Sequence, residues 1–136
     1  MRVFFDTNVL IAAFISHGVC AELFEHCLTT HEILTTEWVL GEYYRALREK
    51  FSFDKHLTEE SLLFLRRNLT VAKAQTLEKQ VCRGADDDNV IAGALSGKAD
   101  CLITGNKDLL ILKKFKNIPI ILPKDFWKFE SGATKK

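Results

Sequence analysis

The sequence predicts an α/β protein: a three-layer α/β/α sandwich around a central parallel sheet. Two observations support this prediction. Short runs of entirely apolar residues, such as residues 3–5 and 101–103, suit strands that are buried on both faces. Between such runs lie segments with apolar residues at helical spacing, and strands that alternate with helices form parallel sheets through right-handed crossovers.

The first third of the chain shows both patterns. Residues 3–5 are an apolar run that ends at an acid, which suits a buried strand. Residues 8–14 are too few and too uniformly apolar to be assigned from their period. Along residues 19–28 apolar side chains recur at i, i+1, i+4 and i+5, which indicates a helix. A strand is predicted at residues 31–34, and a threonine at position 35 or 36 can cap a helix over residues 37–50.

The rest of the chain continues the alternation. Residues 58–69 form another amphipathic segment, followed by a weak strand at 70–72. Residues 86–96 read as a helix that stops at the glycine that follows. The last predicted elements are a strand at residues 101–103, a short helix at 108–114 and a strand at 118–122.

Composition limits the class of protein. The chain has 136 residues, of which 47% are hydrophobic and 27% charged, as in ordinary single domains. These values exclude disordered, collagen-like and low-complexity proteins. No apolar run approaches the roughly 18 residues of a membrane span, so we expect no membrane association. We predict one domain over residues 1–130 and a flexible tail over 131–136.

The net charge and the spacing of the cysteines do not identify a binding partner. The formal net charge is +1, so any nucleic acid must be attracted by local charge. The four cysteines lie far apart, without a CxxC pair, and free cysteine behaves as a small core residue. We therefore expect reduced thiols and a cytoplasmic protein.

Acidic and polar residues follow two of the predicted strands. Ligands of parallel sheets bind beyond the carboxyl ends of the strands. Asp6 directly follows residues 3–5, and Thr104, Asn106 and Asp108 follow residues 101–103. Taken singly, such residues also cap helices or form turns, and the acids at 86–88 can simply start a helix.

Glu42 is harder to explain as a surface charge. It lies four residues after Trp38 and four before Ala46, on the face that points at the core, where an unpaired carboxylate is costly. Either a lysine or arginine neutralises it, or several inward carboxylates share divalent cations. Asp6, Glu42 and Asp88 would offer the oxygen ligands that Mg²⁺ and Mn²⁺ prefer.

Four segments together resemble a known family. DTNVLIAAF at 6–14, Glu42, DDDNVIAGAL at 86–95 and ADCLITGNKDLL at 99–110 look like a PIN-domain nuclease. The similarity runs from about residue 2 to 127 and is greatest to the toxin components of prokaryotic toxin–antitoxin systems related to VapC. It implies strand order 3-2-1-4-5, a Mg²⁺- or Mn²⁺-dependent ribonuclease acting on RNA, a small antitoxin partner and a homodimer.

The resemblance also assigns residues. It implies that Asp6, Glu42 and Asp88 are catalytic and bind the metal, with Thr104 and Asn8 supporting them. The family's T-G-D-x-D-L-L segment has Asn106 in place of its first aspartate. Asn106 would then offer a neutral oxygen to the metal, Asp108 would supply the missing charge, and a second metal site would be weakened.

Substrate contacts are less clear from sequence. Arg45 and Arg48 lie about one turn beyond Glu42, and Lys107 neighbours Asn106, so these cations could hold RNA phosphates or be solvated surface charges. Because of Asn106, a catalytically weak nucleic-acid-binding module is the alternative to a nuclease. A phosphotransfer fold is disfavoured, since Asp6 is not followed by a D-x-D-x-T pattern.

Overall fold

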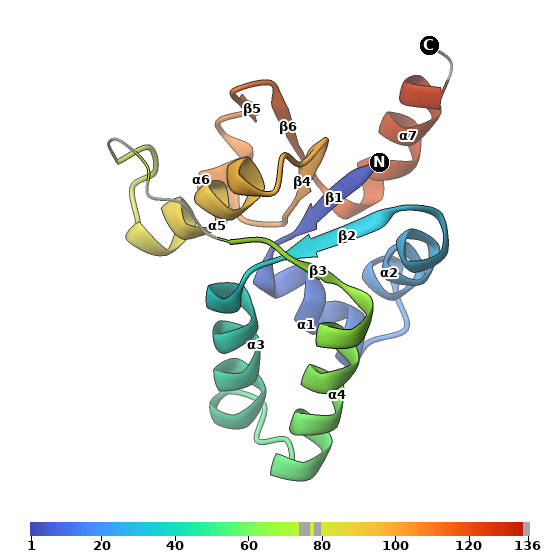
Figure 1. Ribbon diagram of the computed structural model, residues 1–136, viewed down its shortest axis with the longest axis vertical. Helices are drawn as coiled ribbons and strands as arrows, with labels where there is room; N and C mark the ends of the chain where they lie inside the picture. The colour runs from blue at the N-terminus through green and yellow to red at the C-terminus, as the bar shows by residue number, and fades with distance from the viewer. Residues whose placement is uncertain (74–76, 78–79, 135–136) are drawn as a thin grey trace.

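A computed structural model describes residues 1–73, 77 and 80–134 of the chain. Figure 1 shows its strands and helices arranged as a sheet with helices packed on it. The elements in chain order are β1 (Arg2–Phe5), α1 (Thr7–Ile15), α2 (Val19–Thr30), β2 (Glu32–Thr35), α3 (Glu37–Glu49), α4 (Lys55–Asn68), β3 (Thr70–Val71), α5 (Ala85–Ser96), β4 (Cys101–Ile103), α6 (Lys107–Leu110), β5 (Lys114–Phe115), β6 (Ile118–Ile121), the short 3-10 helix η1 (Pro123–Asp125) and α7 (Phe126–Thr134).

The sheet has six strands in the order β3-β2-β1-β4-β6-β5. Over the residues that the structure describes, every pairing is parallel except that of β5 with β6. The α/β class and the parallel sheet are thus confirmed, as is the order 3-2-1-4-5 when β6 is counted as the fifth strand. Strand β1 lies at the centre, paired with β2 on one side and β4 on the other.

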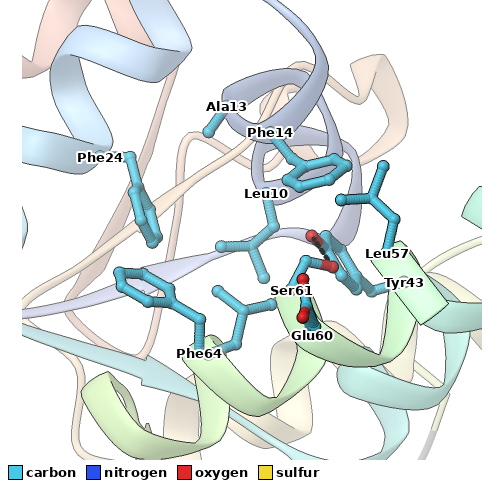
Figure 2. Close-up of a pocket in the computed structure, with 10 residues that line it drawn as sticks. Leu10, Ala13, Phe14, Phe24, Tyr43, Leu57, Glu60, Ser61 and Phe64 are labelled. Atoms are coloured by element: carbon cyan, nitrogen blue, oxygen red, sulfur yellow. Dashed lines mark hydrogen bonds between the residues drawn. The ribbon is translucent and has the colours of Figure 1, made fainter.

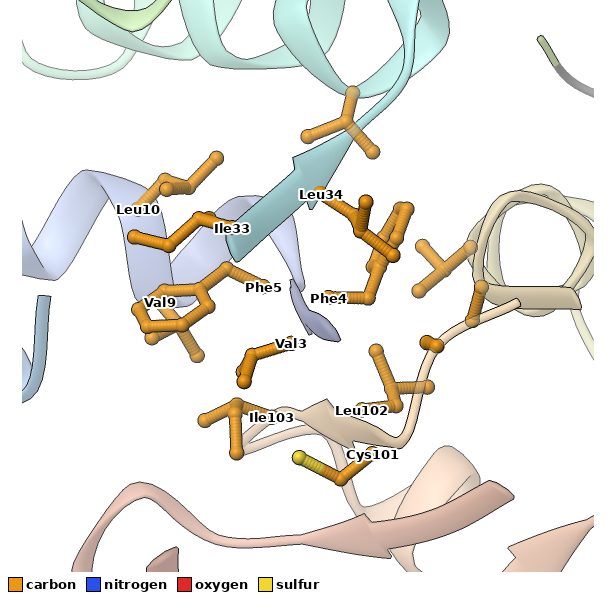
Figure 3. Packing of buried hydrophobic residues seen from close by; sticks show 14 of the residues in the cluster. Val3, Phe4, Phe5, Val9, Leu10, Ile33, Leu34, Cys101, Leu102 and Ile103 are labelled. Atoms are coloured by element: carbon orange, nitrogen blue, oxygen red, sulfur yellow. The ribbon is translucent and has the colours of Figure 1, made fainter. Parts of the chain in front are cut away.

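Alternate side chains of β1 fill the two faces of the sheet. Phe5 stacks edge-on against Phe24 of α2, with ring centroids 5.9 Å apart. Phe4 points to the other face, where α5 packs so closely that a Cβ on Gly93 would lie 2.9 Å from the Phe4 ring. Both phenylalanines are fully buried, and Figure 3 shows them at the centre of the apolar core. Because β1 is covered on both faces, the three-layer prediction is confirmed.

Helix α1 comes from the segment that has no usable period. Its N-cap is Asp6, whose side chain accepts the Thr7 N–H at 2.7 Å. Val9, Leu10 and Ile11 are all buried, and the helix packs against α2 and α3. Most residues of α1 are apolar, whether buried or exposed, so the helix shows little amphipathic pattern, which is why residues 8–14 cannot be assigned from sequence.

The segment after β4 differs from the prediction. The helix expected at residues 108–114 is the shorter α6, and Lys114 already belongs to β5. Lys113 has a φ of 63°, and Lys116 and Asn117 turn the β5–β6 hairpin with φ of 46° and 70°. These left-handed residues end the helix and add an antiparallel strand at the edge of the sheet.

The C-terminal segment forms a helix that has no counterpart in the sequence prediction. Residues 131–134, predicted as part of a tail, continue α7 to Thr134, and residues 135–136 lie outside the described part. In Figure 1, α7 lies beside the start of β1, at the end of the sheet opposite to the carboxyl ends of the strands.

No single helix in the described ranges is long and apolar enough to cross a membrane. Helices α1 and α2 pass that criterion only as a pair, by length and composition, and the chain bends by 103° between them. All four cysteines are free thiols, as predicted, and three of them are buried.

Candidate active site

A polar cavity of about 220 Å³ lies beyond the carboxyl ends of β1 and β4. Residues from α1, α3, α5 and the start of α6 surround it, which is the position where a parallel sheet places its ligands. Its lining residues are Asp6, Thr7, Asn8, Ile11, Trp38, Glu42, Ala46, Lys50, Asp86, Asp87, Val90 and Asn106. Of the residues singled out from sequence, Asp6, Asn8, Glu42 and Asn106 are among them.

Asp6 is the most buried acid of the cavity, with 5% of its surface exposed. Its backbone N–H still pairs with Ile103 of β4, so the strand geometry continues to the point where the side chain enters the cavity. One carboxylate oxygen accepts the Thr7 N–H and the other accepts the Thr104 hydroxyl, at 2.6 Å. Burial raises the pKa of Asp6 above its ordinary value, and although these hydrogen bonds lower it, the nearby Asp87 charge raises it further.

Thr104 supports Asp6 from the end of β4. Its hydroxyl is fully buried, donates to Asp6 Oδ2 and accepts the Asn106 N–H at 3.0 Å. The Thr104 N–H donates to Ile121 of β6, which fixes the backbone on the far side. Thr104, for which the family resemblance implies a supporting role, therefore contacts Asp6 directly.

Asn106 faces the cavity with its amide nitrogen. Its Oδ1 accepts the Asp108 N–H at 2.9 Å as the N-cap of α6, and its Nδ2 donates to Asp87 Oδ1 at 2.7 Å. The oxygen predicted to meet a metal, Asn106 Oδ1, already accepts this backbone N–H of Asp108, and metal binding by Asn106 stays a prediction.

Asp87 lines the cavity, whereas Asp88, the acid predicted from sequence to bind a metal, is absent from the lining. The pKa of Asp87 is raised by partial burial and by the charge of Asp108, although its hydrogen bond from Asn106 lowers it. Asp88 accepts the backbone N–H groups of Val81 and Cys82, the latter at 2.6 Å, and does not line the cavity. Successive helical residues point about 100° apart, and the spacing of a run of three aspartates does not indicate which one faces inward.

Glu42 lines the cavity from α3, with 28% of its side chain exposed. Arg45 donates to its Oε1 at 2.5 Å. Both interpretations of Glu42 left open by the sequence are therefore compatible with the structure: it faces the other acids and it has an arginine partner. Lys50, two turns further along α3, also lines the cavity. Lys50 is not among the residues predicted from sequence, although its spacing of eight residues from Glu42 is the signal that places both on one face.

The remaining predicted residues lie outside the cavity lining. Asp108 pairs with Arg83 at 3.3 Å, its charge raises the pKa of Asp87, and its backbone N–H donates to Asn106 Oδ1. Arg48 donates to the Phe53 carbonyl at 2.8 Å and so holds the loop after α3. Lys107 is exposed at the start of α6.

A divalent cation fits the donor set of the cavity. Asp6, Glu42 and Asp87 offer only oxygen ligands, and the charge of Asp87 raises the pKa of Asp6, an effect that a cation would relieve. The Thr7 hydroxyl oxygen, also in the lining, is buried and has no hydrogen-bond partner within the described structure. Across that same part of the chain, the three carboxylates do not form a set within 4.8 Å. This spacing suits Mg²⁺, which keeps several waters and uses one or two carboxylates directly.

A larger cavity of about 380 Å³ has a different character. Figure 2 shows it between α1, α2, α3 and α4, with the rings of Phe14, Phe24 and Phe64 around it. Tyr43 donates its hydroxyl to Ser61 at 3.1 Å on one wall, and Glu60 is the acid of the lining. This apolar cavity shares no lining residue with the carboxylate cavity, so it has no part in the acid chemistry.

The fold and the cavity define a class: an α/β protein with clustered carboxylates where parallel strands end. A family profile described as PIN domain matches residues 2–108. The chain therefore belongs to the PIN-domain family, which confirms the resemblance drawn from its motifs. The search of curated proteins gave no match.

Two solved structures share the fold. VapBC2 from Rickettsia felis, bound to a DNA fragment from their promoter, aligns with TM-score 0.67 and 18% identity over 90% of this chain and 98% of that chain. VapBC-1 from nontypeable Haemophilus influenzae aligns with TM-score 0.65 and 16% identity over 91% and 99% of the two chains. At these identities the likeness establishes a common fold.

Proposed function

We propose that this chain is a divalent-metal-dependent endoribonuclease that hydrolyses phosphodiester bonds in single-stranded or loop RNA. The observation that carries the proposal is the buried Asp6 carboxylate, which faces Asp87 and Glu42 across one polar cavity. A protein keeps such a group ionised in a buried place only where a cation or donors compensate it. Clustered acids of raised pKa are a frequent property of functional sites.

In this proposal Asp6, Glu42 and Asp87 hold Mg²⁺ or Mn²⁺. The bound metal supplies a Lewis acid that lowers the pKa of water and offsets charge on the phosphate. Thr104 fixes the orientation of Asp6, and Asn106 fixes that of Asp87. With Asn106 donating an N–H, the chain has one acid fewer around the cavity, which favours a single strong metal position.

Cations around the cavity give the RNA backbone a place to bind. Lys50 lines the cavity, and Arg45 lies beside it on α3 while partly occupied by Glu42. Phosphate contacts of this kind provide affinity that depends on salt concentration and not on sequence. Trp38 also lines the cavity and offers a ring on which an unpaired base can stack.

We further propose that the chain is the toxin of a toxin–antitoxin pair in the cytoplasm. The two aligned structures are VapBC proteins, which supports a small antitoxin partner and a homodimer. Around the apolar cavity, Phe14, Leu57 and Phe64 are 36%, 42% and 47% exposed, which leaves apolar surface for a partner to cover. Light scattering on the purified chain measures whether it is a dimer before any antitoxin is added.

The decisive experiment is cleavage of a labelled, unstructured RNA with Mg²⁺ or Mn²⁺. We expect cleavage to stop in EDTA and to fall to below about one hundredth in Asp6→Asn. Asp54→Asn is the matched control, because Asp54 is also a helix N-cap, on α4, and asparagine caps equally well. Equal cleavage by Asp6→Asn and the wild type would refute this assignment of the site.

The geometry of Asn106 supports a second candidate, a module that binds RNA without cutting it. The amide replaces the acid that the motif otherwise has and donates to Asp87. Metal-independent RNA binding without turnover at any Mg²⁺ or Mn²⁺ concentration would favour this candidate. Restoring the acid with Asn106→Asp would then be expected to raise cleavage.

A further inference from the structure

Three metal-binding side chains converge at the end of the sheet opposite to the carboxylate cavity. His26 lies on α2, His31 caps the C-terminus of that helix, and Glu130 comes from α7. Glu130 Oε2 lies 2.6 Å from His26 Nε2 and 2.5 Å from His31 Nε2. One carboxylate oxygen is thus shared by two imidazole nitrogens, and all three ligand atoms lie within 4.8 Å of one another.

The cluster is partly shielded from water. The exposed fractions of the His26, His31 and Glu130 side chains are 29%, 7% and 18%. The fully buried Phe126 stacks edge-on against His31 with centroids 5.7 Å apart, and the Trp127 ring lies 4.7 Å from that of His26. Such packing restricts both imidazole rings, so the three groups are held together before any ligand binds.

Hydrogen bonds hold Glu130 and His31 in place. Although partial burial opposes it, the hydrogen bonds from His26 and His31 hold the pKa of Glu130 below its usual value. The other nitrogen of His31, Nδ1, lies 3.0 Å from the Met1 nitrogen, so that ring is held at both ends.

We infer that His26, His31 and Glu130 form a Zn²⁺ site that fastens α7 to α2. Two imidazole nitrogens and one carboxylate are an established zinc ligand set, with a fourth position left for water. Bonds of 2.0–2.1 Å in a tetrahedron place ligand atoms roughly 3.3 Å apart. An outward shift of less than about 1 Å converts the present hydrogen-bonded contacts to that spacing.

This site is chemically distinct from the carboxylate cavity. Imidazole nitrogens select zinc and its transition-metal neighbours, whereas carboxylates alone suit Mg²⁺ and Mn²⁺. Glu130 and α7 also lie beyond residue 108, where the match to the family profile ends. The inference is therefore independent of the proposed nuclease activity.

Cobalt titration of metal-stripped protein tests the inference, with excess Mg²⁺ present to fill the carboxylate cavity. We expect one Co²⁺ per chain, with the visible absorption of tetrahedral coordination, displaced by an equivalent of Zn²⁺. Saturating Zn²⁺ should raise the midpoint of thermal unfolding by about 5–10 °C. Asp6→Asn should bind Co²⁺ as the wild type does, which separates this result from the fate of the nuclease proposal.

His26→Ala and Glu130→Gln each remove one ligand and should weaken Co²⁺ binding at least about tenfold. His56→Ala is the matched control, since His56 pairs with Glu60 at 3.0 Å on exposed α4 and has no third ligand among the residues that the structure describes. Circular dichroism verifies that each variant folds. Absence of stoichiometric Co²⁺ uptake by the wild type, or uptake unchanged in His26→Ala, would overturn the zinc site.

Discussion

Thr104 donates its hydroxyl hydrogen to Asp6 across 2.6 Å, and this buried contact joins the end of β4 to the end of β1. The same hydroxyl oxygen accepts the Asn106 N–H. One small side chain therefore sets the direction of the Asp6 carboxylate and the start of the loop that carries Asn106. Two adjacent parallel strands are needed to bring these groups together.

Thr104→Val should show how much the orientation of the Asp6 carboxylate matters, because it leaves Asp6 itself unchanged. The change keeps the shape of the side chain but leaves Asp6 Oδ2 and the Asn106 N–H unpaired, at a cost of about 1–3 kcal/mol of unfolding free energy. With Asp6 free to rotate, we expect metal-dependent RNA cleavage to fall about 10- to 100-fold. Single-turnover cleavage and urea unfolding measure the two effects.

Two other substitutions serve as controls for Thr104. Thr104→Ser keeps the hydroxyl and should recover most of the cleavage rate. Thr35→Val makes the same change at another fully buried threonine, whose hydroxyl has no hydrogen-bond partner within the described residues, and should leave stability unchanged or higher. Wild-type cleavage by Thr104→Val would show that the hydrogen bond to Asp6 does not orient the acid for catalysis.

Asp87 and Asp88 should respond differently to substitution by alanine. Asp87→Ala removes a cavity carboxylate of raised pKa, so we expect cleavage to be lost without loss of stability. Asp88→Ala leaves the N–H groups of Val81 and Cys82 unpaired and should cost about 1–2 kcal/mol while cleavage is retained. Thermal unfolding and cleavage are measured on both. Loss of cleavage at full stability in Asp88→Ala would instead support Asp88 as the catalytic acid, as predicted from sequence.

The outline of the fold follows from sequence because burial determines the pattern. β1, β2 and β4 are short apolar runs, and α3, with one face buried, has a clear period. Helix α1 and strand β5 could not be predicted from the sequence, for two different reasons. α1 is too uniformly apolar to show a period, and β5 depends on left-handed residues whose conformation the hydrophobic pattern does not predict.

The sequence predicts which strands and helices contribute to the candidate site, but not which side chain of each one faces the cavity. Asp6 and Thr104 are found because strand ends fix them. The choice within residues 86–88 depends on the rotation of α5 about its axis, which the packing of Gly93 on Phe4 determines. The direction of the Asn106 amide depends on the N–H of Asp108, a contact between backbone and side chain that residue spacing does not reveal.

Gly93→Ala should reveal how closely α5 packs on the sheet. A Cβ at Gly93 would lie 2.7 Å from the Thr36 side chain and 2.9 Å from the fully buried Phe4 ring, so either the ring or the helix must move. We expect a loss of about 1–3 kcal/mol in unfolding free energy, measured by urea denaturation. Gly41→Ala is the matched helical control, because nothing lies within 4 Å of its Cβ, and it should stabilise by about 0.5–1 kcal/mol. A neutral Gly93→Ala would mean that the two layers separate at little cost.

Asp6→Asn should stabilise the metal-free protein. Because burial raises the Asp6 pKa, the folded state binds its proton more tightly than the unfolded state does, and stability falls as the pH rises above the unfolded value of 3.8 toward the raised one. Removing the charge should therefore add about 1 kcal/mol at neutral pH. Urea unfolding in EDTA between about pH 4 and pH 7 should show this gain growing with pH and then levelling off. A gain that is equal at all pH values, or one shared by Asp54→Asn, would contradict burial of the Asp6 charge as its cause.

Thiol reactivity tests the buried cysteines directly. Burial raises the pKa of Cys27 and of Cys82 to about 12, and for Cys82 the contact with Asp88 adds to the effect. At pH 8 roughly one ten-thousandth of such thiols is ionised, and the thiolate is the reactive form. We expect iodoacetamide to modify the partly exposed Cys20 first and the buried thiols only after unfolding, as measured by mass spectrometry of the peptides. Fast modification of Cys82 in the folded protein would show that the loop held by Asp88 opens, and would shift the role of Asp88 from fastening that loop toward the chemistry of the cavity.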